Sequence, residues 1–301
     1  MNNPIRKSPA RAAGAAAAFL LIFAGLLAPL SAEAPREPFV QIVPHAEIGY
    51  VAILSHLYRS GPVGTATEFD FVTQGGQDNL YPYQRYSADV VLGGRNRVTL
   101  LYQPLTVNTR TVADRNGSNG GNPVVIDDAT FAPGTPMDIT YGFDFWRVSY
   151  LFDFARSPDT ILGVGLSLQL RNASIVFTSV DTTPGVRAVQ QNIGPVPILK
   201  ARAAHWFSPA IGVDFEADGF YASSAIFNGS GKPFEGWIWD AALSAKTHLA
   251  PKAVAFLTVR SIGGGALGTN AYDYRSATTN VSGETYNALA TLAGVVGFSL
   301  E

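Results

Sequence analysis

The chain has 301 residues, of which 47% are hydrophobic, 11% aromatic and 15% charged, and its net charge at pH 7 is −2. The absence of cysteine excludes a disulfide framework and a lipid anchor on cysteine, and it disfavours thiolate metal sites. A slightly acidic chain without a basic patch is not expected to bind nucleic acid.

The N-terminal segment predicts export. A run of mostly Ala, Leu and Phe covers residues 12–30, and the small residues of Ser-Ala-Glu-Ala follow it. The cations that precede this run are Arg6, Lys7 and Arg11. This order is typical of a signal peptide, so we expect one over residues 1–34, cleaved after Ala32 or Ala34, and a single domain over 35–301. Because the run approaches spanning length, a membrane anchor is the alternative.

Alternation of apolar and polar residues predicts about ten β-strands. Leu162, Val164 and Leu166, for example, are separated by Gly163 and Gly165. In chain order the expected strands lie near residues 46–58, 82–92, 97–103, 146–154, 162–171, 199–207, 211–218, 237–246, 255–260 and 286–300.

Short and long connections alternate between these strands. The short ones are expected at 93–96, 155–160, 208–210 and 250–251. The long ones are expected near 59–81, 113–136, 179–194, 225–234 and 267–284. Outer-membrane barrels have short periplasmic turns, long external loops and an even number of strands that alternate between lipid and lumen. A soluble sheet that buries its apolar face against a second layer is the alternative.

The expected fold class is therefore all-β: an antiparallel, up-and-down transmembrane β-barrel of about ten strands in the bacterial outer membrane. Its expected neighbour is outer-membrane lipid, which the apolar face of each strand contacts. Above Phe145 and Arg171 the alternation changes phase. We interpret this change as a β-bulge or as wall that rises above the bilayer.

The segment from Pro197 to Tyr221 predicts a β-hairpin whose polar face carries opposed charges. If residues 208–210 form a three-residue loop, Arg202 faces Glu216 and Lys200 faces Asp218. Opposite charges across a strand pair favour this register. The apolar residues of both strands then share the other face.

The last strand adds a resemblance to a known group. Thr291, Ala293, Val296 and Phe298 follow a polar-x-Gly-x-x-apolar-x-aromatic pattern, with alanine in the glycine position and Leu300-Glu301 after the aromatic residue. In this pattern and in its architecture, the chain resembles small outer-membrane β-barrels of the outer-membrane protein A and W type. The resemblance implies that the last strand is an assembly signal, read by the barrel-insertion machinery.

Charged residues at lumen-facing positions are nearly balanced in sign. They include Glu47 and Arg97, and the expected network is Arg85, Asp89, Arg147, Asp153, Arg171, Lys200, Arg202, Asp214, Glu216, Asp218, Asp240, Lys246 and Arg260. Buried charges are costly unless they are paired. Since side chains just fill the interior of a barrel near eight strands, the network favours a plugged lumen over a charged pore.

The sequence offers weak candidates for catalysis and metal binding. Asp214, Glu216 and Asp218 could bind a metal, but cations face them. Asp114 opens a calcium-loop spacing in which Val125 stands at the closing glutamate. His56 is expected on the lipid side, where outer-membrane lipid hydrolases place a histidine. No catalytic motif occurs, so the chain is predicted to be no enzyme and to hold no metal or cofactor.

Three functions remain open at this point. The first is a plugged barrel with a structural role or a role in binding through its exposed loops. The second is a narrow pore for small solutes, and the third is an outer-membrane enzyme that acts on lipid or peptide. The sequence names no external ligand.

Overall fold

The computed structural model describes residues 39–225, 234–275 and 280–301, so the expected signal peptide lies outside the described residues. In this part the chain is almost entirely β-strand. The strands are β1 (Val40–Pro62), β2 (Phe69–Asp70), β3 (Leu80–Leu92), β4 (Asn96–Gln103), β5 (Thr106–Val112), β6 (Val124–Ile126), β7 (Ala129–Phe131), β8 (Pro136–Arg156), β9 (Thr160–Ser179), β10 (Arg187–Trp206), β11 (Ile211–Ser223), β12 (Phe234–Ala250), β13 (Ala253–Arg275) and β14 (Asn280–Leu300). One short 3₁₀ helix, η1, covers Arg115–Gly117. Among the described residues, no helix has the length and hydropathy that a membrane crossing would need.

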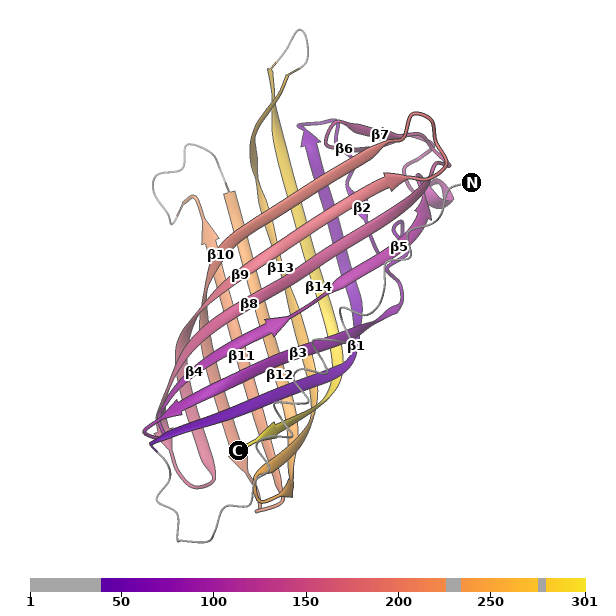
Figure 1. The fold of residues 1–301 in the computed structure, drawn as a ribbon. Coiled ribbons are helices and arrows are strands. Elements are labelled where there is room, and N and C mark those ends of the chain that lie inside the picture. Colours follow the sequence, from indigo (N-terminus) through magenta and orange to yellow (C-terminus); the bar gives the residue numbers. More distant parts are fainter. Residues whose placement is uncertain (1–38, 226–233, 276–279) are drawn as a thin grey trace. The chain divides into compact units, whose positions relative to one another are not determined.

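The strands of residues 39–301 close into an antiparallel barrel (Figure 1). Each long strand pairs with the next along the chain, and β14 pairs with β1 to complete the ring. Because β4 and β5 both pair with β8 and follow each other along it, they fill one position, and the described barrel has ten strand positions. The predicted strand number and up-and-down order are confirmed.

The two ends of the barrel differ. Short turns at 93–95, 157–159, 207–210 and 251–252 lie at one end, where Phe39 and Glu301 also lie. The opposite end, which we call the long-loop end, has the connections at 63–79, 113–135 and 180–186. The first of these carries β2, which pairs with β1, and the second carries the separate β6–β7 hairpin.

Several strands are about twice as long as predicted. β8 has 21 residues and β9 has 20, and their pairing is continuous from Met137/Ser179 to Asp153/Gly163. No register shift occurs at Phe145 or Arg171, so the phase change there is not a bulge. The wall continues toward the long-loop end, which is the other interpretation of the phase change.

Polarity inverts along this continuous wall. In the half nearer the short turns, outward residues of β8 such as Trp146 and Val148 are apolar, while inward Arg147 is charged. In the half nearer the long loops, the outward residues are polar, as at Asp138, and the inward ones are apolar, as at Tyr141. This inversion is expected where a barrel leaves lipid: water then contacts the outside, and the lumen must be filled by apolar packing.

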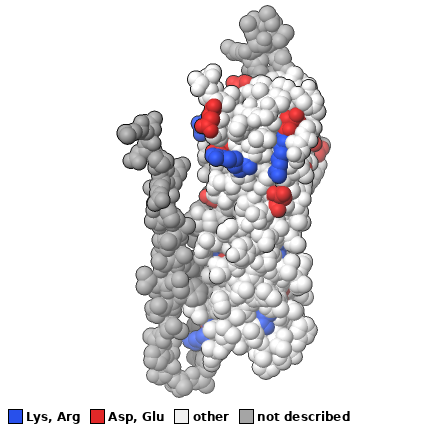
Figure 2. Space-filling view, turned by 90° about the vertical axis from the view of Figure 1, so that its right-hand side faces the viewer, with Lys and Arg blue, Asp and Glu red and all other residues white. Residues whose placement is uncertain are grey.

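The outer surface reflects the same division. On the face seen in Figure 2, acidic and basic side chains gather in the upper part, and a broad band below them is nearly uncharged. Around the barrel, exposed outward residues in the half nearer the short turns include Ile48, Leu166, Leu168, Leu199, Leu243, Leu257 and Val296. Soluble monomers rarely expose an apolar surface of this extent, so the band suits contact with lipid.

One glycine allows β8 and β9 to approach closely. A methyl group at Gly165 would lie 2.8 Å from the Cα of Leu151 and closer still to the carbonyl oxygen of Tyr150. We therefore expect Gly165→Ala to lower the free energy of unfolding by about 1–3 kcal/mol, as overpacking does. Gly194→Ala is the matched control, because nothing lies within 4 Å of that site. Urea unfolding in lipid vesicles measures both, and equal stabilities would contradict the close approach.

Candidate functional site

Buried charges fill the lumen in the half nearer the short turns. Arg147 on β8 is 1% exposed and donates hydrogen bonds to Gln169, Asp218 and Asp240. Its Nε and Nη2 lie 3.0 and 2.7 Å from Oε1 of Gln169, and its Nη1 lies 2.9 Å from Oδ2 of Asp240. Since these partners come from β9, β11 and β12, Arg147 connects four strands inside the lumen.

Two further arginines share Asp240. Nη2 of Arg85 on β3 lies 3.1 Å from Oδ2 of Asp240, and Nη1 of Arg260 on β13 donates to Oδ1 at 2.8 Å. Arg260 also donates to Oε1 of Glu47 on β1 at 3.3 Å. Arg85 donates to Oε1 of Gln103 at 2.7 Å. With Arg147, Asp240 thus forms ion pairs with cations on three different strands.

Lys200 on β10 adds the last cation. Its Nζ lies 3.2 Å from Oδ1 of Asp218 and 3.6 Å from Oε2 of Glu216. We call the connected set the central charge cluster; its members are Glu47, Arg85, Arg147, Lys200, Glu216, Asp218, Asp240 and Arg260. Its four cations match its four carboxylates, which offsets the cost of burying them.

Two smaller charge groups lie nearer the short turns. In one, Oδ2 of Asp214 lies 2.6 Å from Arg202 and 3.4 Å from Lys246. The other surrounds Asp89. The partners of Asp89 are Arg97, His45 and Thr99. Except for Asp153 and Arg171, the sequence-predicted lumen charges are therefore brought together in three groups.

The predicted hairpin has the expected backbone register, but only one of its two expected side-chain pairs, Lys200 with Asp218, is formed. Arg202 is opposite Glu216, and Lys200 is opposite Asp218. The guanidinium of Arg202, however, binds Asp214, and the carboxylate of Glu216 lies beside Lys200. The prediction that the side chains of Arg202 and Glu216 pair with each other is wrong. Long side chains reach diagonal neighbours across a strand pair, and the tilt of barrel strands changes which partner is nearer.

Asp153 belongs to none of these groups. It is fully buried, but its nearest cation is Arg156, whose Nη1 lies 3.8 Å away. Neither carboxylate oxygen of Asp153 has a hydrogen-bond partner among the described residues. The prediction that Asp153 joins the lumen network is therefore not supported by a hydrogen bond.

Aromatic side chains fill the lumen toward the long-loop end. Phe69 and Phe71 come from the connection after β1, and Phe131 comes from β7. All three are buried against Phe177 on β9, with ring centroids 5.2, 5.5 and 6.3 Å from its ring. We call Phe69, Phe71 and Phe131 the aromatic plug. These residues fall within the external connections expected at 59–81 and 113–136, so the plug was not predicted, although the apolar pattern of 69–72 and 124–126 was a signal for it.

His56 also faces the lumen, so the prediction of a lipid-side position is wrong. The pairing of β1 with β14 shifts between Ile53 and Ser55, and this irregularity reverses the faces of the residues that follow. His56 is fully buried and stacks on Phe71 at 4.0 Å. Its Nδ1 lies 2.8 Å from Oε1 of Gln77. These contacts pack His56 against Phe71 of the aromatic plug.

The same shift brings Tyr58 into the lumen. Tyr58 is 2% exposed and contacts Phe71 and Phe177. Tyr50 and Tyr150 do lie on the outer surface.

A polar contact fixes the β6–β7 hairpin inside the barrel. Asp127 lies in its turn and accepts from Oγ of Ser60 at 2.6 Å and from Nε2 of Gln190 at 2.8 Å. The backbone N–H of Asp127 donates to the carbonyl of Ser60. Because Ser60 and Gln190 belong to β1 and β10, the hairpin is attached to two separate strands of the wall.

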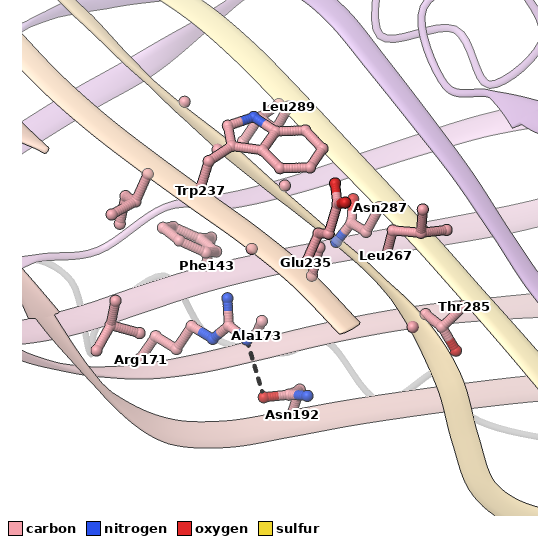
Figure 3. A pocket seen from close by; sticks show the side chains of 18 of the residues that line it. Phe143, Arg171, Ala173, Asn192, Glu235, Trp237, Leu267, Thr285, Asn287 and Leu289 are labelled. Carbon is pink, nitrogen blue, oxygen red and sulfur yellow. Dashed lines mark hydrogen bonds between the residues drawn. The ribbon is translucent and has the colours of Figure 1, made fainter. Parts of the chain in front are cut away.

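A cavity of about 550 Å³ lies beside the plug, toward the long-loop end (Figure 3). Most of its inward-facing lining is apolar or amide, and this lining includes Tyr141, Phe143, Ala173, Ile175, Gln190, Asn192, Phe220, Ile238, Ala266, Asn287 and Leu289. Arg171 on β9 also lines it, apart from the three charge groups, and donates to Oδ1 of Asn192 at 3.2 Å. The prediction that Arg171 joins the paired lumen network is therefore wrong. Its position at the level where the lumen becomes apolar leaves it without a carboxylate partner among the described residues.

The residues of the expected assembly signal occupy both faces of β14. Thr291 and Ala293 face the lumen, and Val296 and Phe298 are exposed on the outside. Oγ1 of Thr291 donates to the carbonyl of Ile262 at 2.7 Å. Recognition by insertion machinery stays a prediction.

The calcium-like spacing at Asp114 has a structural use. The carboxylate accepts from the backbone N–H groups of Asn119 and Gly121, which closes the loop on itself. Across the described ranges, no cluster of three or more His, Cys, Asp or Glu residues is arranged to hold a metal ion.

No protein-family model matches the chain, and no curated protein matches it. Among solved structures, the outer membrane protease OmpT from Escherichia coli is 9% identical, with 90% of this chain and 98% of that chain covered and a TM-score of 0.49. The Pseudomonas putida toluene transporter TodX is 9% identical, with 85% and 89% covered and a TM-score of 0.31. Ail, the attachment invasion locus protein of Yersinia pestis, is 9% identical, with 84% and 99% covered and a TM-score of 0.26. At these identities and TM-scores, no function carries over to this chain.

The geometry of the chain itself defines its class. A closed ring of ten strand positions, an apolar outer band and a polar lumen beneath that band are the features of a transmembrane β-barrel. A soluble two-layer sheet is excluded, because the apolar face points out of a closed ring and the charged face points in.

Proposed function

We propose that this protein is an integral barrel of the bacterial outer membrane that binds a ligand at its outward end and does not conduct. The location is supported by the lipid-facing band and by the expected signal peptide. Short turns at one end and long connections at the other support an orientation with the turns in the periplasm.

The observation that carries this proposal is the filling of the lumen at two levels. The central charge cluster connects opposite walls near the short turns, and Arg147, Asp240 and Arg260 are each at most 4% exposed. The aromatic plug fills the lumen toward the long loops, and the contacts of Asp127 hold the hairpin that carries Phe131. A solute would have to disrupt both levels to pass. The cavity beside the plug remains as space for a ligand.

Planar-bilayer recordings test the closed lumen. The purified protein is expected to give no steady openings at neutral pH, because the paired charges leave no water-filled path. An open porin reconstituted in the same lipid serves as the positive control. Steady, ion-selective openings of the wild-type protein would replace this proposal with the narrow pore.

The location has a separate test. Extraction of the membrane fraction followed by electrophoresis with and without heating should give two positions of migration, because folded barrels of this kind resist detergent until heated. A single position, with the protein in the soluble periplasmic fraction, would contradict the outer-membrane location.

A further inference from the structure

The cavity beside the aromatic plug contains an arginine, Arg171, that has no carboxylate partner among the residues the structure describes. Arg171 faces inward on β9, and within the described residues it donates a hydrogen bond to Asn192. Its Nε is buried and has no hydrogen-bond partner among these residues. Other inward cations, such as Arg147 and Arg260, have carboxylates within 3 Å. Arg171 thus differs from Arg147 and Arg260, each of which is paired with a carboxylate.

The lining around Arg171 supplies no compensating anion. Apolar side chains dominate, and the polar ones that face inward are amides such as Asn192 and Asn287. Glu235 borders the cavity, but it is exposed and has the outward alternation of β12, in which Asp240 faces inward. Figure 3 shows Arg171 and Asn192 joined by their hydrogen bond at one side of the cavity. The cavity therefore combines an apolar wall with one unneutralised positive charge.

We propose that this cavity binds a small amphipathic molecule with an apolar body and one carboxylate, whose carboxylate pairs with Arg171. This inference rests on the proposed function, of which it names the ligand class. The guanidinium group matches a carboxylate in geometry and can donate two parallel hydrogen bonds to it. A single cation balances one negative charge, whereas a phosphate monoester would bring closer to two.

The size and composition of the cavity fit such a ligand. Its volume of about 550 Å³ falls within the range of roughly 300–1,000 Å³ typical of small-molecule sites. Tyr141, Phe143 and Phe220 offer flat apolar surface for an aromatic or branched body. Asn192 is positioned beside the guanidinium group, where its amide can donate to a bound carboxylate oxygen.

Two matched probes test the proposal: naphthalene-2-carboxylate and its neutral analogue naphthalene-2-carboxamide. Binding is measured by equilibrium dialysis at neutral pH with the full-length protein in lipid nanodiscs, and empty nanodiscs correct for partition into lipid. The carboxylate should bind at least about tenfold more tightly than the amide, as expected for a hydrogen bond to a charged group. Arg171→Gln should remove this difference and leave amide binding unchanged.

Two further variants serve as controls. Arg187→Gln changes an exposed arginine on β10 and should alter neither affinity. Ala266→Phe fills part of the cavity and should weaken both probes. Equal wild-type affinities for the two probes, or no binding of either, would overturn the proposal. So would an Arg171→Gln effect no larger than that of Arg187→Gln. The wild-type comparison needs no variant, so the test holds even where Arg171→Gln does not fold.

Conductance of the same purified protein in planar bilayers separates the proposed function from the proposed ligand class. A non-conducting barrel that binds neither probe would overturn only the ligand class. A barrel that conducts steadily would overturn the proposed function, whatever it binds.

Discussion

Replacing Arg147 by methionine is expected to lower the free energy of unfolding by about 3–5 kcal/mol. Methionine keeps much of the volume but leaves the carboxylates of Asp218 and Asp240 buried without one of their cations. The loss is large because both carboxylates are nearly inaccessible to water, so solvent cannot replace the guanidinium. Urea unfolding of the protein in lipid vesicles, followed by tryptophan fluorescence, measures the change.

Arg110→Met is the matched control for this experiment. Arg110 binds Asp138 through two hydrogen bonds of 2.6 and 3.0 Å, so its geometry is as good as that of Arg147. Both partners are exposed, however, at 68% and 49% of their side-chain surface. Water and salt screen such a pair, and its removal should have a far smaller effect. If the two variants lose the same stability, the lumen is wetter than the central charge cluster implies.

Leu166→Arg should destabilise the inserted barrel by about 2–4 kcal/mol. Leu166 lies on the outward face of β9, is 62% exposed and is surrounded by outward leucines on the same strand. An arginine there would have to enter hydrocarbon or bend toward the interface. Folding into vesicles of defined thickness, followed against urea concentration, measures the cost.

Val176→Arg tests the same strand and the same face beyond the proposed edge of the bilayer. Val176 has the outward alternation of Leu166, but its neighbour across the strand pair is Thr140, in the region where the outer surface is polar. The substitution should change the stability by less than about 1 kcal/mol. If Val176→Arg costs as much as Leu166→Arg, lipid covers the whole wall and the polarity inversion has another cause.

The strand halves nearer the short turns could be predicted because apolar residues face the lipid and polar residues face the lumen. In β9 the leucines at 162, 166, 168 and 170 face out, while Gln169 faces in, and this alternation is visible in the sequence. The strand halves nearer the long loops were not predicted, because there water lies outside the wall and packed apolar side chains lie inside it. The alternation there continues with reversed polarity, so the expected strand ends at residue 171 instead of 179, and residues 187–194 fall within the expected connection at 179–194.

Single-residue irregularities and long-range contacts could not be predicted. The shift between Ile53 and Ser55 changes the direction of His56, yet no turn residue in the sequence marks it. The aromatic plug depends on contacts between Phe71, Phe131 and Phe177, which are far apart along the chain. The charge balance of the lumen was visible, but the choice of partners, such as Asp214 for Arg202, depends on the geometry of the closed barrel.

The pairing of β1 with β14 determines when the barrel can close. Their pairing runs from His45/Ser299 to Pro62/Gly283, so the strand synthesised first has its final partner only when the strand synthesised last arrives. Until then both strands have an open edge that can join another chain. Both edges therefore stay unpaired until β14 forms, and a chain that ends before β14 would keep them unpaired.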